Sequence, residues 1–121
     1  MTEQWEPMTS DFDTYQDFSM SRAGSDLGER DRLILAGLGM AGEAGEVADL
    51  VKKAIYHNAP LDREKLILEA GDVLWYVAYL ADALGVPLSR IAEANREKLL
   101  RRYPNGFSAQ DAQRRLDEVP K

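Results

Sequence analysis

Two short stretches, Glu43–Glu46 (EAGE) and Glu69–Asp72 (EAGD), decide the fold of this chain. Each places two carboxylates three positions apart within a strongly helical pattern, so each pair shares one helix face and its like charges repel. If the two stretches form antiparallel helices joined by a turn, all four carboxylates meet in one place. Such a cluster is tolerable only when cations lie between the carboxylates. Oxygen ligands without thiolate or imidazole indicate Mg²⁺ or Mn²⁺.

The surroundings of the second pair favour a metal site over ordinary surface charge. An isolated Glu-x-x-Glu is most often two solvated side chains, but Glu69 and Asp72 lie within residues 66–75, one of the most apolar segments of the chain. Carboxylates at the border of a core are costly unless they are paired or metal-bound. A di-iron bundle would require Glu-x-x-His motifs, whereas the only histidine, His57, has Ala54 three positions before it. The di-iron alternative is therefore weaker.

A glycine-rich motif in the same segment suggests a competing fold. Residues 37–42 (GLGMAG) match the dinucleotide-binding fingerprint, follow a strand-like segment at 33–35, and precede Asp62 by about the expected distance. That fold places pyrophosphate at a helix N-terminus, where Glu43 and Glu46 would repel it. Everything downstream is also helical in pattern, so no parallel sheet is available. We therefore interpret these glycines as sites of close helix packing, or as thin backbone near a ligand.

The pattern of apolar residues and caps predicts an all-α fold, a bundle of four to five helices. Thr9 or Ser10 caps the first helix, which ends near Arg22. Asp62 caps the third helix and Gly85 stops it. The later helices are expected at residues 30–57, 63–84, 88–102 and 108–116. We predict a single domain, residues 1–121, with its core at about 10–107 and a short C-terminal helix at about 108–116.

Composition and charge limit the class of protein. A chain of 121 residues can build one core but leaves much apolar surface uncovered, so we expect the bundle to be completed by oligomerisation, as a homodimer or homotetramer. The net charge of −6 argues against nucleic-acid polymers and anionic membranes as partners. The absence of cysteine excludes disulfides and thiolate chemistry. Residues 1–6 lack the order of a secretory signal, and no apolar run could span a bilayer, so we expect a cytoplasmic protein.

Three groups of residues together resemble the MazG-like group of all-α nucleoside triphosphate pyrophosphatases. They are GLxxxGEAGEVADLVKK at residues 37–53, ExxDVLWY at 69–76 and NxxKLxxR at 95–102. Each piece is common, but the combination is specific and the resemblance covers about residues 12–107. It implies a MazG-like helical bundle in which Glu43, Glu46, Glu69 and Asp72 are the catalytic residues and hold Mg²⁺, with Mn²⁺ as a second possible metal.

The resemblance also implies the reaction. Water attacks the α-phosphorus of a bound nucleoside triphosphate and releases nucleoside monophosphate and pyrophosphate. One position departs from the family, whose fullest motif is Glu-Glu-x-x-Glu, because Gly42 replaces the leading glutamate that can activate the water. Either the bound metal or another nearby carboxylate, such as Asp49, would have to activate the water instead. The sequence leaves both open.

Basic side chains are expected to bind the triphosphate, because phosphoryl-type transfer requires positively charged groups beside the phosphate oxygens. The candidates are Lys53, Lys98, Arg101 and Arg102. Lys53 and Lys98 are preferred because they match the motifs of the family. A basic residue near a helix C-terminus often serves only the helix dipole, so each of these residues also has a structural interpretation.

Three further residues are predicted to bind the nucleoside part of the substrate. Asn95 interrupts an apolar stripe and is placed either to bind a sugar or base, or to serve a structural role. Trp75 and Tyr76 begin one helical turn after Asp72, where a stacked base could reach them. Their spacing is equally that of ordinary core or subunit-interface packing.

We therefore predict a Mg²⁺-dependent pyrophosphohydrolase acting on ribo- or deoxyribonucleoside triphosphates. One alternative is a related diphosphohydrolase of the same fold, such as a phosphoribosyl-ATP pyrophosphohydrolase. The other is a catalytically silent helical protein that acts by oligomerisation or partner binding, and Gly42 is its best support. Release of pyrophosphate from a panel of nucleoside triphosphates distinguishes the predicted pyrophosphohydrolase from these two alternatives.

Overall fold

The computed structural model describes residues 11–24 and 26–118. Within these ranges the chain is helical and has no β-strand, apart from one isolated bridge between Pro104 and Gly106. The elements are α1 (Phe12–Met20), α2 (Glu29–Tyr56), α3 (Arg63–Ala83), α4 (Leu88–Arg102), α5 (Ala109–Arg114) and a 3₁₀ turn at Leu116–Glu118. The predicted all-α fold is confirmed. None of the described helices is long and apolar enough to cross a membrane.

The ends of the helices follow their capping residues. The Asp62 carboxylate accepts a hydrogen bond of 3.0 Å from the Lys65 amide, so the predicted cap of α3 is confirmed. Gly85 follows the end of α3 with a φ of +71°, a conformation that favours glycine. Helix α1 is capped by Asp11, and the predicted caps Thr9 and Ser10 lie outside the described residues. Helix α1 also ends two residues before the predicted Arg22.

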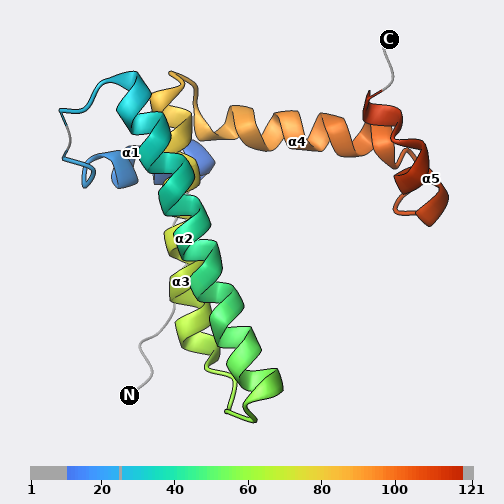
Figure 1. The fold of residues 1–121 in the computed structure, drawn as a ribbon. Helices are drawn as coiled ribbons and strands as arrows, with labels where there is room; N and C mark the ends of the chain where they lie inside the picture. Colours follow the sequence, from blue (N-terminus) through green and yellow to red (C-terminus); the bar gives the residue numbers. More distant parts are fainter. Residues whose placement is uncertain (1–10, 25, 119–121) are drawn as a thin grey trace. The chain divides into compact units, whose positions relative to one another are not determined.

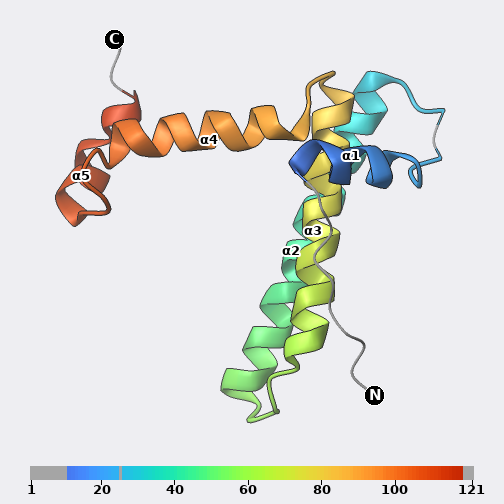
Figure 2. The same ribbon diagram turned by 180° about the vertical axis from the view of Figure 1, so that it is seen from behind.

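Helices α2 and α3 form an antiparallel hairpin (Figures 1 and 2). The turn between them contains Asn58 with a φ of +51°, which asparagine tolerates better than most residues. Small side chains let the helices approach, and Ala36 of α2 and Ala83 of α3 are buried. Among the described glycines, only Gly39 has a neighbour close to the place of a side chain, because an added Cβ atom would lie 2.2 Å from Cε1 of Tyr76. This contact confirms close helix packing for one of the predicted glycines.

Helix α1 packs against α3 and contacts the segment that follows α3. The buried Gln16 side chain donates to the Val86 carbonyl at 3.1 Å and accepts from the Leu88 amide at 2.8 Å. Gln16 therefore satisfies one backbone carbonyl that follows α3 and the backbone amide of the first residue of α4. The Gln16 side chain ties α1 to the end of α3 across 70 and 72 positions of sequence.

The contacts of the chain define two compact units, residues 1–88 and 89–121. The second unit contains nearly all of α4, together with α5 and the 3₁₀ turn. An ion pair joins α4 to the 3₁₀ turn within this unit. Arg102 donates to both oxygens of Asp117, at 2.5 and 2.9 Å. The Asp117 side chain is 4% exposed, and the bond to Arg102 holds its pKa below the usual value. That the whole chain acts as one domain stays a prediction.

The Gly39 contact predicts opposite effects for two glycine substitutions in α2. Gly39→Ala forces the Tyr76 ring or the helix to move, and we expect a loss of about 1–3 kcal/mol in the free energy of unfolding. Gly37→Ala is the matched control, because a Cβ there meets nothing within 4 Å. We expect Gly37→Ala to be neutral or to stabilise by up to about 1 kcal/mol. Urea denaturation measures both, and equal effects of the two variants would contradict the packing role of Gly39.

Candidate metal centre

Three of the four predicted ligands meet between α2 and α3. One carboxylate oxygen from each of Glu43, Glu69 and Asp72 lies within 4.8 Å of the other two. Glu43 comes from the middle of α2, and Glu69 and Asp72 come from successive turns of α3. The antiparallel hairpin therefore produces the convergence that the i, i+3 spacing predicts.

The fourth predicted ligand, Glu46, borders this cluster. Its side chain is exposed and is not one of the three that converge, but its charge acts on Glu43. The pKa of Glu43 is raised by partial burial, by a hydrogen bond with Glu69, and by the charges of Asp72, Glu69 and Glu46. These are the causes expected when several carboxylates share one site.

Within the part of the chain that the structure describes, no basic side chain forms an ion pair with Glu43, Glu46, Glu69 or Asp72. Converging carboxylates without a basic partner repel each other, and a divalent ion relieves that repulsion. The donors are all carboxylate oxygens, which are the ligands that Mg²⁺ and Mn²⁺ prefer. The residues present therefore fit a hard divalent cation.

Lys53, one of the predicted phosphate ligands, lies in the last turn of α2, beyond Glu46. Its ammonium group is 2.8 Å from Asp49, and Lys52 lies 3.7 Å from the same carboxylate. The bond to Asp49 raises the pKa of Lys53, and the charge of Glu46 adds to this shift. The same bond lowers the pKa of Asp49. Asp49, a candidate for activating water, is thus a weak base while Lys53 contacts it.

The predicted aromatic residues form one connected cluster. Trp75 meets the Tyr76 ring edge-on with ring centroids 5.2 Å apart, and it stacks on Tyr79 with centroids 5.4 Å apart. Trp75 and Tyr76 are half-buried, whereas Tyr79 is 1% exposed. Tyr76 also packs on Gly39, so part of its ring serves the contact between the helices. The packing interpretation of the aromatic residues therefore has a structural basis, and ligand binding stays a prediction.

The four remaining predicted residues, Asn95, Lys98, Arg101 and Arg102, lie in the second unit, and Arg101 is exposed. Asn95 lines an open groove of about 510 Å³ along α4, together with apolar side chains that include Leu99 and Tyr103. Lys98 is exposed, and its charge acts on Asp117. Arg102 is half-buried and bound to Asp117, a partner that sequence reasoning missed. No local signal pointed to this pair, because the two residues lie 15 positions apart, on either side of α5.

Relatives with matching sequences are known in phages and bacteria. The chain is 42% identical over 73 residues to the Gene 37 protein of Mycobacterium phage L5, a match that covers 57% of this chain and 64% of that protein. It is 39% identical over 70 residues to the Uncharacterized protein YvdC of Bacillus subtilis (strain 168), which covers 50% of this chain and 66% of that protein. The chain thus spans slightly less than two thirds of either relative. No solved structure matches.

A family profile covers the segment that builds the acidic cluster. The MazG nucleotide pyrophosphohydrolase domain matches residues 35–107, which include the converging carboxylates of α2 and α3. This match extends over more than half of the chain and agrees with the all-helical fold. The chain therefore belongs to the MazG nucleotide pyrophosphohydrolase domain family.

Proposed function

We propose that this protein is a Mg²⁺-dependent pyrophosphohydrolase that converts ribo- or deoxyribonucleoside triphosphates to monophosphates and pyrophosphate. The observation that carries the proposal is the convergence of Glu43, Glu69 and Asp72 within 4.8 Å without a basic partner among the described residues. Membership in a pyrophosphohydrolase family supports the same reaction. Mn²⁺ is a second metal that these ligands suit.

The geometry of the acidic residues supports a role for each in this proposal. Glu43, Glu69 and Asp72 hold the metal, and Glu46 completes the set from the border of the cluster. When bound, the metal supplies positive charge to the phosphate oxygens and aligns the attacking water. The carboxylates themselves would repel a triphosphate, so they act on the substrate only through the cation.

Other side chains bind the rest of the substrate in this proposal. Lys53 exchanges its bond to Asp49 for a phosphate oxygen, and this exchange frees Asp49, one helical turn after Glu46 on α2. Trp75 and Tyr76 offer ring surfaces to the nucleoside. The roles of Asn95, Lys98 and Arg102 as substrate ligands stay predictions.

Pyrophosphate release tests the proposal directly. A panel of ribo- and deoxyribonucleoside triphosphates is incubated with and without Mg²⁺, and monophosphate and pyrophosphate are measured. Turnover that requires Mg²⁺ supports the proposal. Absence of turnover with every nucleotide would favour the catalytically silent alternative, which the replacement of the leading glutamate by Gly42 supports.

The position of bond cleavage is a separate prediction. If water attacks the α-phosphorus, reaction in ¹⁸O-labelled water must place the label in the monophosphate and leave the pyrophosphate unlabelled. Mass spectrometry of both products measures the label. Label in pyrophosphate would mean attack at the β-phosphorus and a different reaction.

We also propose that the protein is a cytoplasmic homo-oligomer, a dimer or tetramer. The hairpin of α2 and α3 exposes large apolar side chains, including Leu38 at 70% and Leu68 at 69%. Apolar surface of this kind marks an interaction site in a stable protein. Sedimentation velocity at micromolar concentration is expected to show a dimer or tetramer. A folded monomer with full activity would refute this part of the proposal.

A further inference from the structure

The second unit has an apolar groove but no buried core. The groove has a volume of about 510 Å³ and runs along α4, between side chains that include Leu99, Leu100 and Tyr103. Leu99 is 44% exposed and Leu100 is 54% exposed. Phe107, whose ring centroid lies 5.3 Å from that of Tyr103, is exposed as well. Among the described residues of this unit, 89–118, none is buried as a whole residue.

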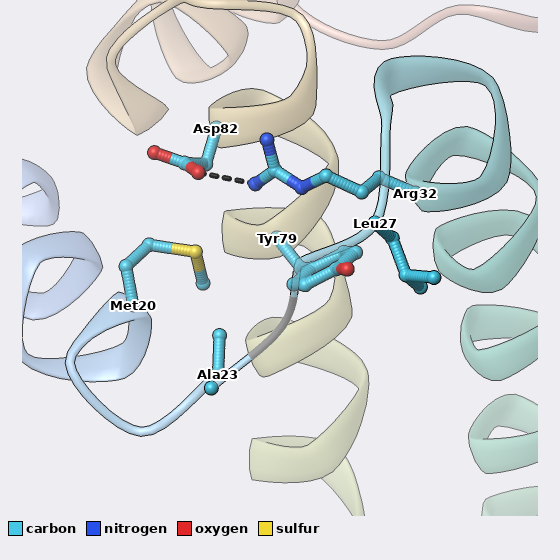
Figure 3. A pocket seen from close by; sticks show the side chains of 7 residues that line it. Met20, Ala23, Leu27, Arg32, Tyr79 and Asp82 are labelled. Atoms are coloured by element: carbon cyan, nitrogen blue, oxygen red, sulfur yellow. Dashed lines mark hydrogen bonds and ion pairs between the residues drawn. The ribbon is translucent and has the colours of Figure 1, made fainter.

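The first unit differs, because its helices bury a core. Tyr79 is buried in it, and the Arg32 guanidinium lies over the Tyr79 ring at 5.0 Å from the centroid (Figure 3). The same guanidinium donates a hydrogen bond to Asp82, drawn as a dashed line in Figure 3. The charged groups that line the cavity of the first unit thus bind each other, whereas the apolar groove of the second unit is uncovered.

A helical unit of this size requires buried apolar surface to be stable. Short isolated helices are marginal in water, and most of the stability of helices in proteins comes from packing of an apolar face. The bond between Arg102 and Asp117 joins α4 to the 3₁₀ turn, but an ion pair is a weak source of stability. The apolar side chains of the groove therefore need a surface from outside the second unit.

The charge of the two units indicates which surface this is. Residues 89–121 contain eight basic and five acidic residues. Residues 1–88 contain seven basic and sixteen acidic residues, so the first unit is strongly acidic. In the described part of the second unit, Arg90, Lys98 and Arg101 take part in none of the ion pairs. Opposite net charge favours contact of a second unit with a first unit, and like charge opposes contact between two second units.

The first unit has a matching apolar surface on its hairpin. Leu38 of α2 and Ile67 and Leu68 of α3 are all exposed. Leu68 directly precedes Glu69 of the acidic cluster. The hairpin therefore combines exposed apolar side chains with negative charge, and the second unit combines them with positive charge. In an interface of this kind the apolar contact supplies most of the affinity, and the charges favour the correct pairing.

We infer that the groove of the second unit binds the α2–α3 hairpin of a second copy of this chain. This inference rests on the homo-oligomer proposed above and names its interface. Each copy has one groove and one hairpin, so two copies exchange these contacts reciprocally and form a closed dimer with two identical interfaces. The contact gives the second unit the buried apolar surface that it lacks.

Photo-crosslinking identifies what occupies the groove. The chain has no cysteine, so Leu100→Cys provides a single site for a benzophenone maleimide. Unlabelled and ¹⁵N-labelled chains of this variant are unfolded, mixed and refolded together, so mass spectrometry separates links between copies from links within one chain. We expect links between copies, with the acceptor peptides in residues 29–83. Links within one chain alone, or links between copies whose acceptors lie in residues 89–121, would overturn the inference.

A charge placed in the groove tests the same interface without a probe. Because Leu99 is partly exposed in a single chain, Leu99→Asp should have little effect on a protein whose groove stays open. In the inferred interface the new carboxylate is buried against apolar side chains, so we expect the dissociation constant of the dimer to rise about 100-fold or more. Gln113→Asp, exposed in the same unit but outside the groove, is the matched control and should keep the dissociation constant of the parent.

Sedimentation velocity over a dilution series measures these dissociation constants. If Leu99→Asp fails to fold, the crosslinks of Leu100→Cys decide the question. Folded Leu99→Asp with the dissociation constant of the parent would overturn this interface and leave the homo-oligomer standing. A parent protein that is monomeric at every concentration would refute both. Neither measurement requires nucleotide or Mg²⁺, so the result does not depend on whether the protein hydrolyses nucleotides.

Discussion

Asp72→Asn is expected to abolish turnover, by about 1,000-fold or more, while the metal-free protein stays as stable as the parent. Asp72 is one of three carboxylates within 4.8 Å, and it has no basic partner among the described residues. Neutralising it removes like-charge repulsion and keeps a polar group of similar shape. We therefore expect the melting temperature without metal to be equal or up to about 4 °C higher. Glu46→Gln should behave in the same direction.

The response to Mg²⁺ completes this prediction. A ligand stabilises a protein in proportion to its binding, so Mg²⁺ should raise the melting temperature of the parent and have little effect on Asp72→Asn. The exposed control Asp31→Asn should respond to Mg²⁺ as the parent does. If the cluster were a set of buried salt bridges instead, the same substitution would lower the melting temperature by more than about 10 °C with or without Mg²⁺. Thermal melts of the three proteins distinguish the two cases.

Gln16→Leu is expected to cause the largest loss of stability in the first unit. The side chain is 7% exposed, and it satisfies the Val86 carbonyl and the Leu88 amide at 3.1 and 2.8 Å. Leucine fills a similar volume but leaves the buried Leu88 amide and the part-buried Val86 carbonyl without a partner. An unsatisfied buried group costs about 1–3 kcal/mol, and the Val86 carbonyl is only part-buried, so we expect a total loss of about 2–4 kcal/mol in the free energy of unfolding.

Urea denaturation followed by circular dichroism measures this loss. Gln113→Leu, at an exposed position, is the matched control and should change the free energy of unfolding by less than about 0.5 kcal/mol. A loss for Gln16→Leu that does not exceed that of the control would show that water replaces the Gln16 contacts.

The helices and the convergence of three carboxylates could be predicted from the sequence because both depend on local spacing, whereas Glu46 was predicted to join them and lies outside the converging group. Apolar periodicity placed α4 at Leu88–Arg102 and placed α2 within one residue of its ends. The i, i+3 pairs at Glu43 and Glu69 fix which carboxylates share a helix face, and a short turn between two long helices leaves them few ways to meet.

Contacts between residues far apart in sequence were decided only by tertiary structure. Arg32 meets Asp82 across 50 positions, and Gln16 binds Leu88 across 72. Several glycines of α2 have a similar local pattern. Gly39 is the one that must lack a side chain, because the Tyr76 ring packs against it. No periodicity encodes such pairs, because they depend on the rotation and depth at which packed helices interlock. The sequence by itself therefore determined the helices and the chemistry of the acidic cluster, and the packing of those helices decided which partners surround it.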